Sequence, residues 1–129
     1  MKFAYTILYV PDVVEIIEFY ERAFDFQRGF IHESGEYGEL QTGNTTLSFA
    51  SLTLANSNLD GGVIPSDPQR PPAAFEVAFS TDDVAAAYSR AVAAGATPVS
   101  APKQKAWGQT VAYVRDLHGN LVELCTPMS

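Results

Sequence analysis

The stretch Trp107 to Thr126, WGQTVAYVRDLHGNLVELCT, decides the fold, because it is typical of two β-strands joined by a tight polar turn. Side chains on both sides of the turn alternate with period two, so each arm has two distinct faces. The turn, Asp116 to Asn120, contains Asp, Gly and Asn, which tolerate the backbone conformations of a reversal. We therefore predict a hairpin whose returning arm carries one acid, Glu123, which faces either solvent or a site.

Composition limits what the rest of the chain can be. A chain of 129 residues fits one domain with a sizeable core, and 47% hydrophobic residues exclude a disordered protein. With 15 acids against 8 bases, the net charge of -7 disfavours binding to nucleic acid or anionic membranes. No apolar run has the length of a membrane span, and no signal peptide is visible, so we expect a soluble cytoplasmic protein. The single cysteine, Cys125, is interpreted as a small buried residue rather than a nucleophile.

Periodicity along the chain predicts strands and helices in a repeated order. Asp12 and Glu15 resemble a capping box that opens a helix. Residues 52–72, rich in Asn, Gly and Pro, leave little room for a regular element and are interpreted as a connector or lid. The predicted helices are Val13–Phe24 and Val84–Ala94, and the predicted strands are residues 2–10, 27–32, 37–41, 45–51, 74–80, 97–100 and the two hairpin arms.

The second half of the chain repeats the first. When Asp12-Val13 is aligned with Asp83-Val84, Tyr5 matches Glu76, and alignment of the two hairpins matches Ser48 with Glu123. Internal repetition of this kind indicates two copies of one structural unit. We therefore expect a single domain, 1–129, with a first module over about 1–51, a connector over 52–72 and a second module over about 73–129.

Three segments together resemble one known group of proteins. They are Tyr5-Thr6-Ile7-Leu8-Tyr9-Val10 running into Asp12 and a helix with Phe19-Tyr20, then Trp107-Gly108-Gln109, and finally Asp116-Leu117-His118-Gly119-Asn120-Leu121-Val122-Glu123-Leu124. The chain resembles the glyoxalase, bleomycin-resistance and extradiol-dioxygenase group, the vicinal oxygen chelate superfamily, over nearly its whole length. The resemblance implies an α+β fold of two βαβββ modules whose curved mixed sheets form a cleft. It also implies a divalent metal held by one residue from each of four strands.

The metal ligands that the resemblance implies are altered in this chain. By position they would be Tyr5, Ser48, Glu76 and Glu123. Only the two glutamates are ordinary metal ligands at physiological pH, since neutral Tyr and Ser oxygens bind divalent cations weakly. The resemblance thus implies an incomplete ligand set in which Glu76 and Glu123 hold a metal weakly, and it does not support a high-affinity zinc or nickel site. His32 and His118 lie away from these positions and are interpreted as surface residues.

Two acids on one wall of a cleft could act in two ways. Close together they repel, which raises the proton affinity of one and leaves a general acid beside a general base. They could equally recognise a cationic or hydroxylated ligand. We therefore take Glu76 and Glu123 as the candidate catalytic residues. The candidate substrate-binding residues are Tyr5, Glu39, Ser48, Phe49, Trp107 and Tyr113, with Tyr9 as a further aromatic wall.

Three functions remain open from the sequence. The first is a lyase, isomerase or dioxygenase with a weakly held divalent metal. The second is a metal-free protein that sequesters a small aromatic or cationic compound, as the antibiotic-resistance members of the family do. The altered ligand set favours this second function, whereas the retained Glu76 and Glu123 favour an enzyme. The third is a degenerate enzyme kept as an interaction module. The resemblance also implies a homodimer, because members of the family often dimerise or exchange modules.

Overall fold

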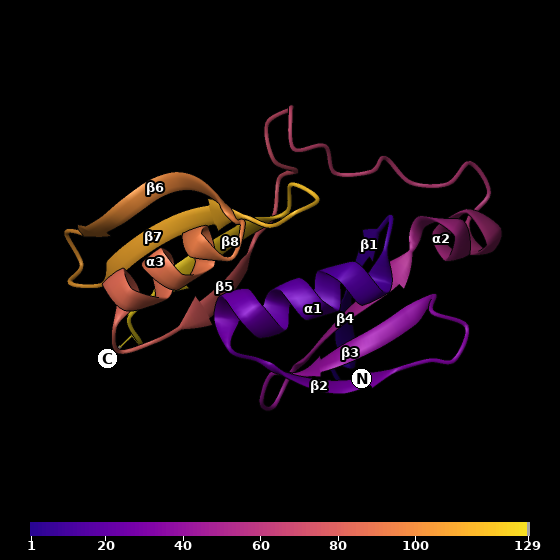
Figure 1. The fold of residues 1–129 in the computed structure, drawn as a ribbon, viewed down its shortest axis with the longest axis horizontal. Helices are drawn as coiled ribbons and strands as arrows, with labels where there is room; N and C mark the ends of the chain where they lie inside the picture. The colour runs from indigo at the N-terminus through magenta and orange to yellow at the C-terminus, as the bar shows by residue number, and fades with distance from the viewer. Residues whose placement is uncertain (129) are drawn as a thin grey trace. The chain divides into compact units, whose positions relative to one another are not determined.

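The described residues of the chain, 1–128, form a repeated series of elements in a computed structural model (Figure 1). The chain divides into an N-terminal unit, Met1–Pro65, and a C-terminal unit that begins at Ser66. Each unit holds one open, four-stranded mixed sheet, which confirms the predicted α+β fold of two βαβββ modules. The elements are β1 (Tyr5–Val10), α1 (Val13–Phe24), β2 (Gln27–Ile31), β3 (Tyr37–Gln41), β4 (Thr46–Ser51), α2 (Leu52–Asn58), β5 (Val77–Ser80), α3 (Val84–Ala93), β6 (Thr97–Gln104), β7 (Thr110–Arg115) and β8 (Leu121–Cys125).

The N-terminal unit has the strand order β1-β4-β3-β2, and β1 runs parallel to β4. Helix α1 begins where predicted, because the side chain of Asp12 accepts a hydrogen bond of 3.0 Å from the backbone N–H of Glu15. The helix lies along one face of the sheet (Figure 1), and four of its apolar side chains are fully buried. These are Ile16, Ile17, Phe19 and Tyr20. The opposite face of the sheet carries none of this helix packing.

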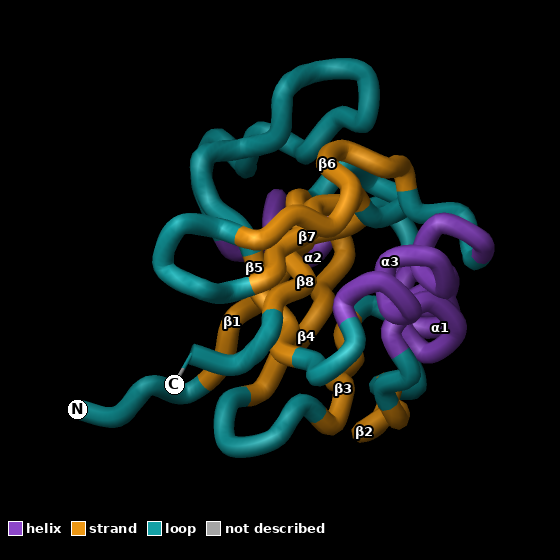
Figure 2. Tube along the Cα trace, turned by 90° about the vertical axis from the view of Figure 1, so that its left-hand side faces the viewer, coloured by secondary structure: helices purple, strands orange, loops and turns teal. Residues whose placement is uncertain are grey.

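The C-terminal unit repeats this plan with the order β5-β8-β7-β6. Asp83 caps α3 as Asp12 caps α1, by accepting a 3.0 Å hydrogen bond from the N–H of Ala86. The helix contacts β6, β7 and β8 on one face of the sheet (Figure 2), and Val114 and Val122 are fully buried. Strand β5 begins at Val77 rather than at residue 74, so the prediction of a longer strand was wrong there.

The predicted hairpin between β7 and β8 is confirmed, and its turn is organised by Asp116. This side chain is 2% exposed and accepts hydrogen bonds of 2.9 Å from the backbone N–H groups of His118 and Asn120. Gly119 supplies the positive φ of 90° that the turn requires. His118 is partly buried within this turn, so its assignment to the surface was wrong, whereas His32 is exposed as predicted.

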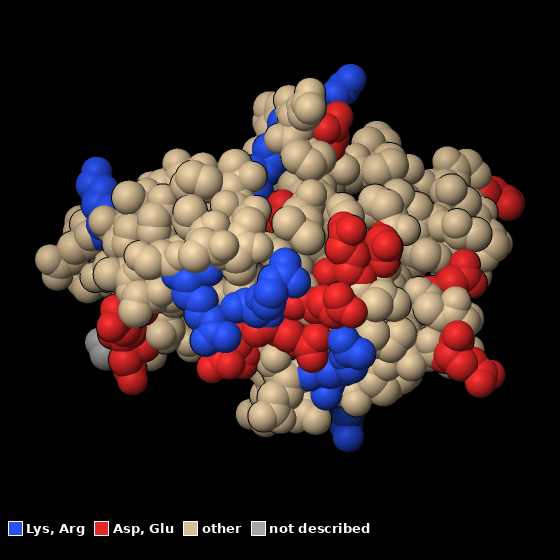
Figure 3. All heavy atoms as spheres, viewed as in Figure 1, with Lys and Arg blue, Asp and Glu red and all other residues tan. Residues whose placement is uncertain are grey.

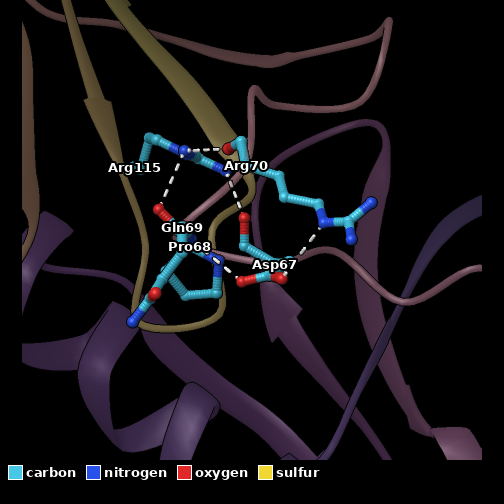
Figure 4. A network of polar contacts seen from close by, with 5 residues as sticks. All are labelled: Asp67, Pro68, Gln69, Arg70 and Arg115. Carbon is cyan, nitrogen blue, oxygen red and sulfur yellow. Dashed lines mark hydrogen bonds and ion pairs between the residues drawn. The ribbon is translucent and has the colours of Figure 1, made fainter.

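The connector is more ordered than the sequence predicted. Residues Leu52–Asn58 form helix α2, because the hydroxyl of Ser51 accepts a 3.0 Å hydrogen bond from the N–H of Leu54 and the first helix-breaking glycine comes only afterwards. At its other end the connector is fixed to the C-terminal unit. The guanidinium of Arg115 donates to three carbonyls of residues 67–70 (Figure 4), and the Ser66 hydroxyl donates to the side chain of Asn120. The predicted lid of about 20 residues, 52–72, is therefore not one free segment. Within residues 1–128 it starts with a helix and is hydrogen-bonded to the C-terminal unit near its end.

Two further properties of the described residues concern partners. Within residues 1–128, no helix has both the length and the apolar composition needed to cross a membrane. The face drawn in Figure 3 carries both acidic and basic side chains amid uncharged surface, and it does not show a continuous basic surface. The excess of acids in the sequence therefore indicates that the protein attracts cationic ligands more than anionic ones.

Candidate functional site

One face of the C-terminal sheet carries a cluster that we call the acidic face, which comprises Glu76, Ala78, Tyr113, Glu123 and Cys125. It is the face opposite α3, since alternate residues of a strand point to opposite sides. Glu123 lies directly across from Tyr113 on β7 and from Ala78 on β5. Cys125 lies two residues beyond Glu123 on the same strand, and Glu76 lies immediately before β5.

Glu123 and Tyr113 form the fixed part of the acidic face. The phenol of Tyr113 donates a hydrogen bond of 2.9 Å to Oε1 of Glu123. This hydrogen bond, followed by burial and by the negative charge of Glu123, raises the pKa of Tyr113 to about 12. Tyr113 therefore remains a neutral donor at physiological pH, and it holds one oxygen of the carboxylate in place.

Glu76 and Glu123 are close enough for their carboxyl groups to form a hydrogen bond. Two carboxylates cannot make such a bond unless one of them carries a proton. Partial burial, and then the hydrogen bond and charge of Glu123, raise the pKa of Glu76 above its ordinary value. The neighbouring acid thus raises the proton affinity of Glu76, which is the direction expected for two acids on one wall.

Cys125 also belongs to this face, although we predicted no role for it there. It is 8% exposed, which confirms that it is a buried residue. Burial, and then the hydrogen bond and charge of Glu123, raise the pKa of its thiol. The neutral thiol is a weak nucleophile and a weak metal ligand. Its spacing of two residues from Glu123 on the same strand could have predicted that Cys125 lies on this face.

The N-terminal sheet carries a second polar cluster on the corresponding face. Ile7 lies across from Ser48, as Ala78 lies across from Glu123, so the register confirms that Ser48 occupies the position equivalent to Glu123. Ser48 is fully buried, and its hydroxyl lies 3.0 Å from the phenol of Tyr37. That phenol also donates a 2.9 Å hydrogen bond to Oε2 of Glu39.

The protons in this cluster can be assigned from the donors available. A phenol has one proton, and a carboxylate only accepts, so the proton of Tyr37 goes to Glu39 and the hydroxyl of Ser48 donates to Tyr37. Burial raises the pKa of Tyr37, its hydrogen bond with Ser48 lowers the pKa, and Glu39 raises it. The sequence did not identify Tyr37, although it lies two residues before Glu39 on the same face of β3.

The other candidate residues are distributed differently from the prediction. Phe49 is fully buried in the helix-facing core, with its ring centroid 4.9 Å from that of Tyr20, so it is not a ligand wall on the face of Ser48. Neighbouring strand residues point to opposite sides, which is the reason for this correction. Tyr5 is 53% exposed on β1. The convergence of Tyr5 and Ser48 with the two glutamates of the other unit stays a prediction.

Trp107 lines a small pocket together with residues that precede β7 and follow β8. Its indole is 65% exposed, and its N–H donates a 2.7 Å hydrogen bond to the side chain of Gln109. Gln109 in turn donates to the carbonyl of Thr126, which fixes the position of the ring. Gly108, Thr126, Pro127 and Met128 complete the lining of this pocket.

A family model, "Glyoxalase/Bleomycin resistance protein/Dioxygenase superfamily", matches residues 2–124. The chain belongs to this superfamily. No curated protein matches the sequence. Among solved structures, a glyoxalase-related enzyme from Fulvimarina pelagi is 21% identical with a TM-score of 0.82, over 98% of this chain and 88% of that one.

Two further solved structures extend the comparison. A glyoxalase/bleomycin resistance protein/dioxygenase family enzyme from Burkholderia phytofirmans PsJN is 23% identical with a TM-score of 0.73, over 99% of this chain and 100% of that one. TioX from Micromonospora sp. ML1 is 21% identical with a TM-score of 0.74, over 99% of this chain and 100% of that one. At these identities the likeness shows the fold alone, and it does not show which reaction, if any, the protein catalyses.

The superfamily often binds a divalent metal, and the residues of this member do not fit one well. Within residues 1–128, no group of three or more His, Cys, Asp and Glu side chains is placed to hold a metal ion. The remaining atoms beside Glu76 and Glu123 are the phenol of Tyr113 and the thiol of Cys125, and the pKa of each is raised. Protonated phenols and thiols are poor ligands, because binding requires the deprotonated form. The arrangement can instead accept hydrogen bonds and transfer a proton.

Proposed function

We propose that this superfamily member binds a small organic compound on the acidic face, through hydroxyl or ammonium groups that donate to Glu76 and Glu123, and that it needs no resident metal. The observation that carries this proposal is the pair of neighbouring carboxyl groups, in which Glu123 raises the pKa of Glu76. Among the described residues, no Lys or Arg forms an ion pair with either glutamate. The acceptor oxygens of the pair therefore have no cationic partner from the described chain, and a ligand can supply one.

The neighbours of the pair support a ligand of modest size. Ala78 and Ser80 present small, exposed side chains on the same side of β5. The ring of Tyr113, held by its hydrogen bond to Glu123, offers an apolar surface beside the acceptors. An ammonium group bound here would favour the fully ionised pair, so binding would release a proton. Titration calorimetry in buffers of different ionisation enthalpy measures that release.

A lyase or dioxygenase with a weakly held divalent metal is the alternative function. It is favoured by the acid and base that the carboxyl pair provides, since general acid–base catalysis needs both protonation states side by side. Elemental analysis of protein purified without chelators, followed by dialysis titration with manganese, nickel and zinc, separates the two functions. Stoichiometric metal that is lost from a Glu76→Gln, Glu123→Gln double variant would establish the alternative and overturn the metal-free proposal.

The test of binding uses a panel of hydroxylated compounds and amines, screened by ligand-observed NMR against the wild type. For any compound that binds, we expect Glu76→Gln and Glu123→Gln each to weaken affinity about tenfold, or about 1.4 kcal/mol. Glu18→Gln, at an exposed position of α1, is the matched control and should bind as the wild type does. Wild-type affinity in both site variants would contradict the assignment and favour an interaction module.

We also propose a homodimer, from the family resemblance, and a cytoplasmic location, from the sequence. A light-scattering mass near that of the 14.0 kDa monomer, measured at micromolar concentration, would contradict the dimer. Cell fractionation tests the location.

A further inference from the structure

The segment that follows α2 (Figure 1) contains an exposed aspartate next to an exposed glycine, Asp60-Gly61. The two residues form the centre of a turn, which the N–H of Gly62 closes by donating a 2.9 Å hydrogen bond to the carbonyl of Leu59. Gly61 has a φ of 84°, which the third position of a type II turn requires and which glycine adopts without strain. The side chain of Asp60 is therefore presented to solvent on a turn that depends on its glycine.

The groups that can react with each other at this turn are not held by other residues. In residues 1–128, the carboxylate of Asp60 has neither a hydrogen bond nor an ion pair, and the N–H of Gly61 has no hydrogen-bond acceptor. A Cβ placed on Gly61 would meet no heavy atom within 4 Å beyond its chain neighbours. The nitrogen of Gly61 is thus open to the neighbouring carboxyl group and to water.

Other aspartates lack this combination. Asp60 is the only aspartate that is followed by glycine. Asp67 accepts a hydrogen bond and precedes Pro68, whose nitrogen carries no hydrogen. Asp25 is exposed but precedes a bulky side chain, Phe26. Three further aspartates accept hydrogen bonds from backbone N–H groups, namely Asp12, Asp83 and Asp116.

We propose that Asp60 is a modification site, at which aspartate converts to isoaspartate without an enzyme. The backbone nitrogen of Gly61 attacks Cγ of the protonated carboxyl group of Asp60 and forms a C–N bond. The nitrogen loses its proton, one carboxyl oxygen leaves as water, and a succinimide ring results. Water then opens the ring. Cleavage of the bond to the side-chain carbonyl restores aspartate, whereas cleavage of the bond to the main-chain carbonyl gives isoaspartate. The second step takes up the water that the first step releases, so no other reactant is needed.

The modification alters the connector rather than the acidic face, so it goes beyond the proposed function and does not depend on it. In isoaspartate the main chain runs through the side-chain methylene, which lengthens the backbone by one atom. The turn from Leu59 to Gly62 then loses its spacing and the hydrogen bond that closes it. The segment between α2 and the residues held by Arg115 therefore changes as the protein ages.

The test incubates the full chain in water enriched in the heavy isotope of oxygen and follows uptake of that isotope by peptide mass spectrometry. We expect position 60 to take up label about tenfold faster than Asp25, which corresponds to a barrier lower by about 1.4 kcal/mol. A protease that cleaves before aspartate should progressively fail at position 60, because isoaspartate is not its substrate. The matched variant is Asp60→Glu, which keeps the charge but would have to form a larger, less favourable ring. We expect it to take up no label at this position.

Three outcomes would overturn the inference. They are uptake at Asp60 no faster than at Asp25, complete cleavage before position 60 after incubation, and equal uptake by Asp60→Glu. Hydrogen exchange provides a structural readout, since the N–H of Gly62 should exchange faster in the isoaspartyl fraction. Unchanged exchange there would contradict the loss of the turn. None of these measurements uses ligand binding, so their failure leaves the proposed function of the acidic face unaffected.

Discussion

Arg115 provides a sharp test of how the connector is fixed to the C-terminal unit. Its Nε donates to the carbonyl of Gly119 at 2.9 Å, and its Nη2 donates to that of Asp67 at 2.9 Å. Its Nη1 donates to the carbonyls of Pro68 at 3.2 Å and Arg70 at 2.6 Å (Figure 4). The change Arg115→Lys keeps the positive charge but replaces a planar fork of donors by one compact ammonium group, which cannot span all four carbonyls.

The expected loss follows from the number of hydrogen bonds that Lys cannot replace. If two of the four remain, two are lost at about 0.5–1.5 kcal/mol each. Three of the four are exposed, which favours the lower part of that range, so we expect the free energy of unfolding to fall by about 1–2 kcal/mol. Urea unfolding measures this difference, and hydrogen exchange should show faster opening of residues 67–70.

The control for this prediction is Arg70→Lys. The side chain of Arg70 is 82% exposed and lies 3.7 Å from the carboxylate of Asp67, so its ion pair contributes little. We expect that variant to unfold within about 0.5 kcal/mol of the wild type. Arg115→Lys with wild-type stability and wild-type exchange at residues 67–70 would refute the anchoring role of Arg115.

Three further predictions concern the turn and the acidic face. Gly119→Ala should lower the free energy of unfolding by about 1–3 kcal/mol, which is more than the loss expected for Gly35→Ala. Both glycines have positive φ, but only at Gly119 would a Cβ lie within 3 Å of backbone atoms. Equal losses for the two variants in urea unfolding would contradict this. The raised pKa of Glu76 means that its contribution to stability is present below the unfolded-state pKa and is lost as pH rises through the folded-state pKa. Glu76→Gln should therefore gain stability relative to the wild type between pH 4 and pH 7, about the range set by a pKa above 4.5, and a relative loss over that range would refute the pairing. In Glu123→Gln, the pKa of Tyr113 should fall from about 12 towards its ordinary value, as followed by NMR of the ring, and an unchanged pKa would show that Glu123 is not its cause.

Patterns within single elements were enough to predict most of the fold. Helix α1 has the predicted bounds because Pro11 ends the strand before it and Asp12 caps it. The β7–β8 hairpin, and the sheet face on which each of its side chains lies, followed equally clearly from the alternation of its residues. Helix α2 was missed because it is short and because Ser51, its capping residue, also ends a strand.

The candidate site was predicted less completely than the fold. The period-two alternation of the strands predicted that Tyr113 and Glu123 lie on one face. The alignment of the two halves of the chain added Glu76 to the site. Partners that depend on cross-strand distance, such as Cys125 beside Glu123 or Tyr37 between Glu39 and a serine, leave no distinct mark in the sequence. Only the register of the paired strands determines these contacts.

The central claim, that Glu76 and Glu123 interact as one ligand-binding pair, is tested most directly by NMR titration of the glutamate side-chain carboxyl carbons. The account predicts that Glu76 titrates above its ordinary value of 4.5 in the wild type and moves back towards that value in Glu123→Gln. Titration of Glu76 at its ordinary pKa in both proteins would contradict the pairing, and with it the site proposed to bind the ligand.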